Sequence, residues 1–160
     1  MTKTRTTETL WFLNTRVEIA IAGDSNQDQL SVIRHWAPFG DSPPLHIHDT
    51  EDEVFHLFSG VMRFTVGGET VTIQAGDTIV APKGVEHTFC VESPEGAHFM
   101  TVTSPGDFEK MVREVGRPAE NDGLPEAKHP TKEEAAALGA ICASHGIRLI
   151  GPPLEPRAAA

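Results

Sequence analysis

Short apolar stretches with a two-residue period run from about residue 10 to residue 104. In one of them Val17, Ile19 and Ile21 fall on the same face of an extended segment. Glycine and proline separate these stretches, and Gly67–Gly68 predicts a tight hairpin turn between two of them. Many short strands at close spacing indicate an antiparallel sandwich or barrel, so we expect an all-β domain.

The composition changes near residue 104, and two helices are expected beyond it. The segment 104–116 offers Ser104 as an N-cap, followed by proline in the first turn. The segment 131–146 begins with a capping box, in which Thr131 and Glu134 satisfy each other's backbone N–H groups. We therefore predict one β domain over residues 1–104 with a helical extension over residues 105–160 that packs on it.

The second helix has only a narrow apolar stripe, formed by Leu138, Ile141 and Cys142. A short helix of this kind is marginal alone and needs a docking surface. We expect this helix and the extended tail that follows it to pack on the outside of the barrel, on their own or a partner subunit. Two roles stay open for them, a lid that limits access to a cavity and simple packing.

The charge and the apolar content narrow the class of protein. A formal net charge of −10 disfavours binding to nucleic acid, because phosphate groups repel such a surface. No apolar run approaches the length of a membrane span, and the first residues do not resemble a secretion signal. Two cysteines do not make a disulfide framework. We expect a cytoplasmic protein that binds neither nucleic acid nor membranes.

Three histidines and a glutamate form the strongest candidate site. His46 and His48 lie two residues apart on a predicted strand and therefore share a face. Glu53 begins the next strand, and His87 begins a strand further along the chain. Three imidazoles and one carboxylate suit a divalent first-row metal, and this set accepts Fe, Ni, Mn, Co, Cu or Zn.

The spacing of these residues is distinctive. It is G-x5-HxH-x4-E-x6-G from Gly40 to Gly60 and G-x5-PxG-x2-H from Gly76 to His87. Both patterns resemble the two motifs of the cupin superfamily. The resemblance implies a small antiparallel jelly-roll barrel with one metal held inside. The implied ligands are His46, His48, Glu53 and His87. The motif usually ends in Asn where this chain has Val91, which is no ligand position but makes the substrate wall more apolar.

The single barrel followed by the helical segment 104–116 is similar to quercetin 2,3-dioxygenase-like cupins. We therefore expect a small, mainly apolar or aromatic substrate that chelates the metal, with Glu53 acting as both ligand and base. Five side chains on strand faces are candidates for the pocket wall: Phe55, Met62, Phe64, Phe89 and Val91.

Two other functions stay open. One is an isomerase, decarboxylase or lyase for a keto acid or sugar, which would favour a charged pocket with Arg34 or His98 facing inward. The other is a non-catalytic binding module. His35 and His98 either support the site or make ordinary hydrogen bonds on their strands, whereas His56 is expected outside the cavity.

The remaining acidic and histidine side chains are expected in solvent. We expect Glu51 and Asp52 to be solvated turn residues, and His129 and His145 to be exposed residues of the extension. The chain is also expected to form a homodimer. The apolar strand faces that need cover are those of Val17, Ile19 and Ile21 and of Val54, His56 and Phe58.

Overall fold

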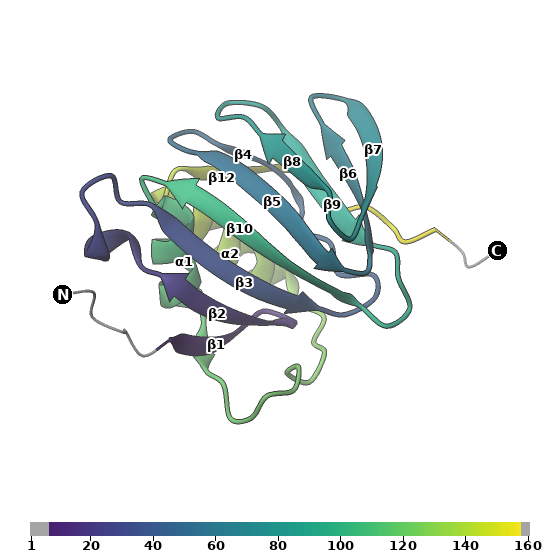
Figure 1. Ribbon diagram of the computed structural model, residues 1–160, viewed down its shortest axis with the longest axis horizontal. Coiled ribbons are helices and arrows are strands. Elements are labelled where there is room, and N and C mark those ends of the chain that lie inside the picture. The colour runs from purple at the N-terminus through teal and green to yellow at the C-terminus, as the bar shows by residue number, and fades with distance from the viewer. Residues whose placement is uncertain (1–6, 158–160) are drawn as a thin grey trace.

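The computed structural model describes residues 7–157, which form two antiparallel sheets and two α-helices (Figure 1). The seven-stranded sheet contains, in spatial order, β11 (Arg117–Pro118), β1 (Glu8–Phe12), β2 (Thr15–Ile21), β3 (Ser31–Ala37), β10 (Ala97–Ser104), β5 (Asp52–Ser59) and β8 (Thr78–Ala81). The five-stranded sheet contains β12 (Ile147–Gly151), β4 (Leu45–His48), β9 (His87–Val91), β6 (Val61–Val66) and β7 (Glu69–Gln74). The helices are α1 (Asp107–Val115) and α2 (Lys132–Ser144), and a 3-10 turn covers Gly23–Ser25. The prediction of an all-β jelly-roll domain with a helical extension is confirmed.

The inner face of the seven-stranded sheet is covered in two different ways. Over β5, β8 and part of β10 it faces the five-stranded sheet, and over β1 to β3 it faces α1 and α2, which lie behind these strands in Figure 1. We call the first interior the barrel core and define it by these buried residues: Ala37, Phe55, Leu57, Met62, Phe64, Ile73, Ala81, Val91, Ala97 and Phe99. We call the second the helix-covered core, with these members: Leu10, Phe12, Val17, Ile19, Ala22, Ile33, Met111, Val112, Cys142 and Ile147.

Local signals in the sequence account for several boundaries. Gly67 and Gly68 both have positive φ, 56° and 82°, and join β6 to β7 by the predicted two-residue turn. The capping box is present, because Glu134 N donates to Thr131 Oγ1 and Thr131 N donates to Glu134 Oε2. The N-cap predicted for the first helix is wrong. Ser104 ends β10 and donates to Asp28 O, so α1 begins two residues later than expected.

The tail after α2 differs from the prediction that it packs outside the barrel. Residues Ile147–Gly151 form β12, a strand of the five-stranded sheet itself, paired with β4. The pairing sets Ile147 opposite His48 and Leu149 opposite His46. The extension is therefore hydrogen-bonded directly to the strand that carries two of the candidate ligands.

The face of Val17, Ile19 and Ile21, predicted to need cover from another layer or another subunit, is covered mostly within the chain. Val17 and Ile19 are buried in the helix-covered core, so the chain's own helices supply their cover. Ile21, at the end of β2, is 43% exposed. Among residues 7–157, no helix is long and apolar enough to cross a membrane.

Candidate metal centre

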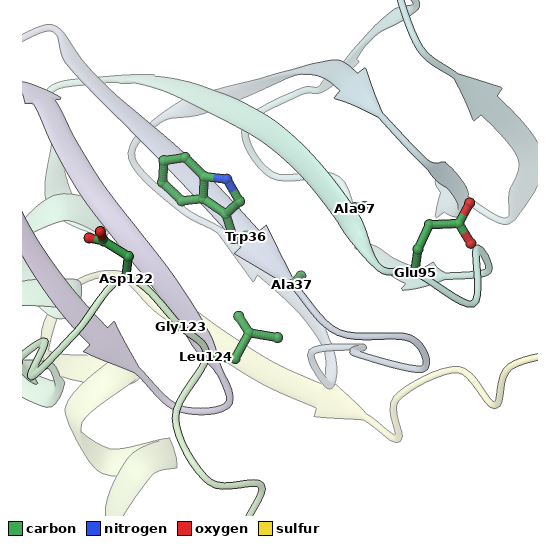
Figure 2. Close-up of a pocket in the computed structure, with 7 residues that line it drawn as sticks. All are labelled: Trp36, Ala37, Glu95, Ala97, Asp122, Gly123 and Leu124. Carbon is green, nitrogen blue, oxygen red and sulfur yellow. The ribbon is translucent and has the colours of Figure 1, made fainter.

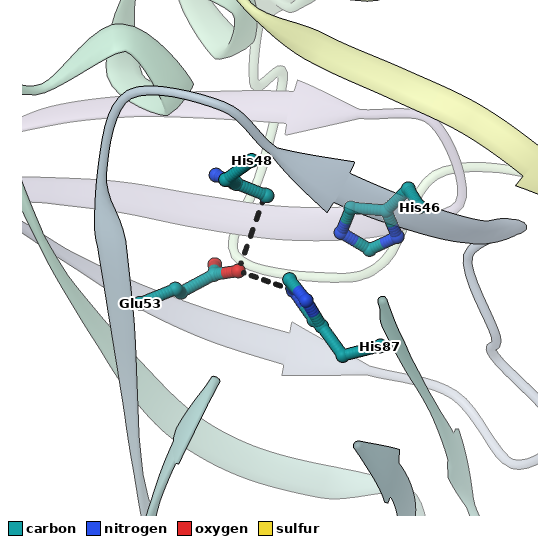
Figure 3. A group of neighbouring side chains, drawn as sticks. All are labelled: His46, His48, Glu53 and His87. Carbon is teal, nitrogen blue, oxygen red and sulfur yellow. Dashed lines mark hydrogen bonds and ion pairs between the residues drawn. The ribbon is translucent and has the colours of Figure 1, made fainter. Parts of the chain in front are cut away.

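The four predicted ligands come from three strands that meet in the interior. His46 and His48 project inward from β4, His87 from β9 and Glu53 from β5, and all four are buried (Figure 3). His46 is paired with His87 across the β4–β9 ladder, so the register brings their rings together. One candidate ligand atom from each residue lies within 4.8 Å of those of the other three. The four residues, which are far apart in parts of the sequence, thus form one compact group in space.

Hydrogen bonds fix which nitrogen of each ring points into this group. His46 Nδ1 lies 2.8 Å from Pro44 O, and His87 Nδ1 lies 3.2 Å from Val85 O. A carbonyl oxygen only accepts, so Nδ1 carries the proton in both rings and Nε2 is free for a ligand. His48 Nδ1 is held in the same way, by a carboxylate oxygen 3.1 Å away.

The inward atoms are all acceptors in this tautomer. His87 Nε2 lies 3.2 Å from Glu53 Oε2, and His48 Nε2 lies 3.4 Å from the same oxygen. His48 Nε2 is buried and has no hydrogen-bond partner among the described residues. Buried lone pairs that face one another are costly unless a cation lies between them. The donor set therefore fits a divalent transition metal, with the three Nε2 atoms and Glu53 Oε2 as ligands.

The electrostatics of Glu53 and His46 agree with this fit, whereas the raised pKa of His48 favours its protonated form, from which a metal would have to displace the proton. Burial by itself raises the pKa of Glu53, but His48, His87 and His46 outweigh it and hold that pKa at about 2. Burial, together with the neighbouring His87 and His48, lowers the pKa of His46 to about 4. For His48 burial acts in the same direction, yet the carboxylates of Glu53 and Glu51 outweigh it and raise its pKa. The group therefore offers a carboxylate and a neutral His46 at neutral pH, which are the forms that bind metals.

The prediction for Glu51 as a solvated turn residue is wrong. Its side chain is 1% exposed and accepts hydrogen bonds from His48 and from the first residues of α1. Residues near Glu51 carry no sign of this contact, because α1 lies more than fifty residues away along the chain. Asp52 is exposed, as predicted, and accepts from Lys83 N at 2.8 Å.

Of the two histidines with open roles, His35 lies inside and His98 outside. His35 Nε2 is 2.9 Å from Thr101 Oγ1, and its ring stacks on Phe99 at 4.6 Å. Burial lowers the pKa of His35 to about 4, so it is a neutral interior group. His98 stacks on Trp36 at 4.4 Å on the outer face of the seven-stranded sheet.

The structure also shows where Arg34 and the remaining histidines lie. His56 lies outside the barrel, as expected, with Nδ1 2.8 Å from Thr78 Oγ1. Arg34 is exposed and donates to Glu18 at 2.7 Å. His129 is exposed, as predicted, whereas His145 is half-buried and lies 2.6 Å from Glu114 Oε2.

The five predicted pocket residues all belong to the barrel core or pack against it. Met62, Phe64 and Val91 are completely buried, so a substrate would reach them only if the core repacked. Phe89 is half-buried, and Phe55 lies 6.3 Å from the ring of His87. Of the five, Phe89 is the most exposed, and Phe55, although only 2% exposed, is in ring contact with His87, so we expect these two to be best placed for contact with a ligand, and their role stays a prediction.

A surface groove of about 240 Å³ lies elsewhere (Figure 2). Its walls come from the ends of β3 and β10 and from the connection before α2: Trp36, Ala37, Glu95, Ala97, Asp122, Gly123 and Leu124. None of these residues belongs to the four-residue group, so the groove is a separate feature.

Comparison with known proteins agrees with this architecture. The cupin domain family matches residues 33–103. Quercetin 2,3-dioxygenase of Bacillus subtilis is 28% identical over 106 residues, which are 66% of this chain and 31% of that protein. Nitrosourea synthase of Streptomyces achromogenes is 38% identical over 76 residues, 47% of this chain and 16% of that protein. The matches thus span less than a third of either relative.

A solved structure supports the fold. The RmlC-like cupin of Shewanella frigidimarina superposes with a TM-score of 0.53 at 20% identity, covering 66% of this chain and 89% of that one. Residues 33–103 contain both motifs and all four residues of the candidate metal group. This part of the chain is a cupin domain, as its motif spacing predicted.

Proposed function

We propose that this chain is a metal-dependent oxidoreductase of the dioxygenase type, acting on a small, mainly apolar or aromatic molecule that chelates the metal. The observation that carries the proposal is the convergence of three imidazole nitrogens and one carboxylate oxygen at a buried point inside an aromatic barrel. One divalent transition metal per chain, whose identity is left open, would be held by His46, His48, Glu53 and His87.

A bound metal would act as a Lewis acid that lowers the pKa of a chelating hydroxyl or enol of the substrate. Glu53 is the proposed proton acceptor, because it is the carboxylate of the group and its low pKa keeps it unprotonated. The surrounding burial excludes water and strengthens these electrostatic interactions. Phe55 and Phe89 would hold an aromatic ring beside the metal.

The character of the interior favours an apolar substrate over a sugar or keto acid. The alternative isomerase, decarboxylase or lyase depended on an inward Arg34 or His98. Arg34 instead pairs with Glu18 in solvent, and His98 stacks on the outer face of the sheet. His35 faces inward but is neutral, since burial lowers its pKa to about 4.

The names of the two curated relatives lend support from a separate direction. One is a quercetin 2,3-dioxygenase and the other a nitrosourea synthase. Because the matches cover only part of each relative, their substrates are starting points for a screen and nothing more. Aromatic compounds with adjacent hydroxyl and keto groups, quercetin among them, are suitable first probes.

Metal content after purification without chelators tests the site. We expect about one transition metal per wild-type chain, and a sharp loss in His48→Ala with an unchanged circular dichroism spectrum. His56→Ala is the matched control, because it removes a histidine from β5 that faces away from the group. A full metal content in His48→Ala would contradict the ligand assignment.

Dioxygen uptake tests the reaction. With a true substrate, the wild-type protein should consume one dioxygen per substrate, since a dioxygenase retains both oxygen atoms in its products. Glu53→Gln should abolish uptake, and His56→Ala should not change it. Metal binding together with ligand binding, but no uptake with any chelating aromatic probe, would favour the non-catalytic alternative.

The outer face of the seven-stranded sheet is the proposed homodimer surface. Phe58 is 41% exposed and Val80 is 49% exposed there, on neighbouring strands β5 and β8. Such apolar exposure on a sheet is usually covered by another subunit. Light scattering at micromolar concentration should give twice the chain mass for the wild type and the chain mass for Phe58→Asp. A monomeric wild type would refute the dimer.

A further inference from the structure

The loop between His48 and Glu53 contains a buried carboxylate that touches both a candidate ligand and a helix. Glu51 Oε1 lies 3.1 Å from His48 Nδ1 and accepts from Phe108 N at 2.7 Å. Glu51 Oε2 accepts from Gly106 N at 3.1 Å and from Asp107 N at 3.0 Å. All four contacts lie away from bulk water, because the Glu51 side chain is completely buried.

The three backbone contacts complete the start of α1. The first N–H groups of a helix lack partners inside it and are usually satisfied by a side chain at the N-cap. Here the N-cap is Gly106, in the left-handed conformation at φ 81°, and it has no side chain to offer. Glu51 takes over this role from a distant part of the chain, and its negative charge also suits the positive end of the helix.

The contact with His48 sets this ligand apart from the other two. His46 and His87 have Nδ1 bound to carbonyl oxygens two residues earlier in their own segments. His48 is oriented by a side chain, and that side chain is itself fixed by α1. The position of one ligand therefore depends on a helix that lies outside the matched cupin domain.

We propose that Glu51 is a positioning residue, which holds His48 with Nδ1 protonated and Nε2 bare, and so couples the metal centre to α1. This inference rests on the proposed metal site. A carboxylate that orders a ligating imidazole in this way typically changes metal affinity by about 10- to 100-fold. Glu51 contacts Nδ1 of His48, the ring nitrogen that points away from the group, so Glu51 itself is not a ligand.

Glu51→Gln separates the two roles that one carboxylate now combines. An amide has one accepting oxygen, so it cannot accept from Gly106 and Asp107 on one side and from His48 and Phe108 on the other. If the oxygen faces the helix start, the NH2 group faces His48 and favours the tautomer with a proton on Nε2, which cannot bind a metal. If the oxygen faces His48, Gly106 N and Asp107 N both lose their acceptor, whereas the first orientation leaves only Phe108 N without one, so we expect the first orientation.

The measurements use the full chain with Co²⁺ as the probe metal. Titration followed by the ligand-field absorption gives the affinity, and ¹⁵N NMR of the histidine side chains gives the His48 tautomer without metal. Asp52→Asn controls for the loss of a neighbouring negative charge. Thr50→Val controls for disturbance of α1 alone, since Thr50 Oγ1 donates to Asp107 Oδ2 but does not contact His48. Glu51→Asp keeps the negative charge, but its shorter side chain moves the carboxylate away from His48. This variant replaces Glu51→Gln in the experiment if Glu51→Gln does not fold.

We expect about a 10- to 100-fold weaker Co²⁺ affinity and an altered absorption spectrum in Glu51→Gln, and a smaller loss in Glu51→Asp. The His48 tautomer should change in the metal-free Gln variant, and both controls should match the wild type in affinity. Wild-type affinity and tautomer in Glu51→Gln, with only a lower melting temperature, would overturn the inference and leave a structural cap. If the wild type binds no metal, the proposed function fails as well, a result that is distinct because it is seen before any substitution.

Discussion

The barrel core and the helix-covered core bury the same face of one sheet but are made differently. The barrel core lies between two sheets and is rich in aromatic side chains, because Phe55 contacts the rings of Phe64 and Phe99, and Phe89, which packs against this core, contacts all three. The helix-covered core is mainly aliphatic, and residues from both ends of the chain complete it. The first is formed within the matched cupin domain, whereas the second depends on segments that lie outside it.

The candidate metal group lies where the two cores meet. The ring of His87 is 6.3 Å from Phe55 of the barrel core, and the ring of His48 is 6.0 Å from Phe108, which packs against the helix-covered core. The site is therefore supported from both sides. Motif residues alone therefore do not define the support of such a site, because α1 and β12 contact it from the extension.

Deletion of residues 129–160 tests whether the fold and the metal group need the helix-covered core. The deletion removes α2 and β12, so the helix-covered core loses Cys142 and Ile147, and β4 loses the strand that pairs with it. We expect loss of the cooperative thermal transition, seen by circular dichroism, together with loss of bound metal. Thr131→Ala in the full chain is the mild reference, since loss of an N-cap costs about 1 kcal/mol.

Other results of the deletion would be informative. Retained fold and metal with changed ligand affinity would support the lid role that the sequence left open. Unchanged metal content, unfolding and ligand binding would show that the helix-covered core is an accessory layer. That last result would contradict the view that both cores belong to one folding unit.

Each core contains one buried methionine, so the same truncation can be made in both. Met62 on β6 is completely buried in the barrel core, and Met111 on α1 is nearly so in the helix-covered core. Truncation of a buried methionine to alanine costs about 2–5 kcal/mol. We expect Met62→Ala and Met111→Ala each to lower the free energy of unfolding by an amount in this range, measured by urea denaturation. A loss well below 1 kcal/mol for Met111→Ala alone would show that α1 packs loosely.

The sequence could predict the strands and the four-residue group because both depend on local spacing. His46 and His48 share a face by the strand period, and the G-x5-HxH-x4-E pattern places Glu53 after one short loop. The hairpin at Gly67–Gly68 and the capping box at Thr131 are likewise signals within a few residues.

What the sequence could not predict depends on contacts between distant segments. Nothing near Glu51 shows that the start of α1 will cover it, so an acidic residue in a loop reads as solvated. The tail Ile147–Gly151 has the composition of a strand, but its pairing with β4 is a property of the assembled sheet. The same holds for His35, whose position on β3 allows either an ordinary hydrogen bond or a role in a pocket.

The buried His35 should change how the stability of the chain depends on pH. Burial lowers the pKa of His35 from 6.5 to about 4, against opposing attraction from Glu53 and with a minor contribution from His98. Between these pH values the unfolded chain binds the proton and the folded chain does not, so His35 favours unfolding more and more as the pH falls from 6.5 towards 4. The full effect of His35 on the free energy of unfolding is at most about 3 kcal/mol, because each pKa unit corresponds to about 1.4 kcal/mol.

Asp41 acts in the opposite direction over a similar range, because burial raises its pKa to about 6 and makes the folded chain the better proton binder. The dependence of wild-type unfolding free energy on pH is therefore ambiguous by itself. The test compares His35→Gln with the wild type by urea denaturation at several pH values, with a chelator present. The variant should lose less stability between pH 6.5 and pH 4. His56→Gln is the matched control, since His56 also bonds a threonine hydroxyl on a neighbouring strand, but on the outer face. Parallel curves for His35→Gln and the wild type would mean that His35 is hydrated in solution, and that the interior beside the metal group is more polar than its burial indicates.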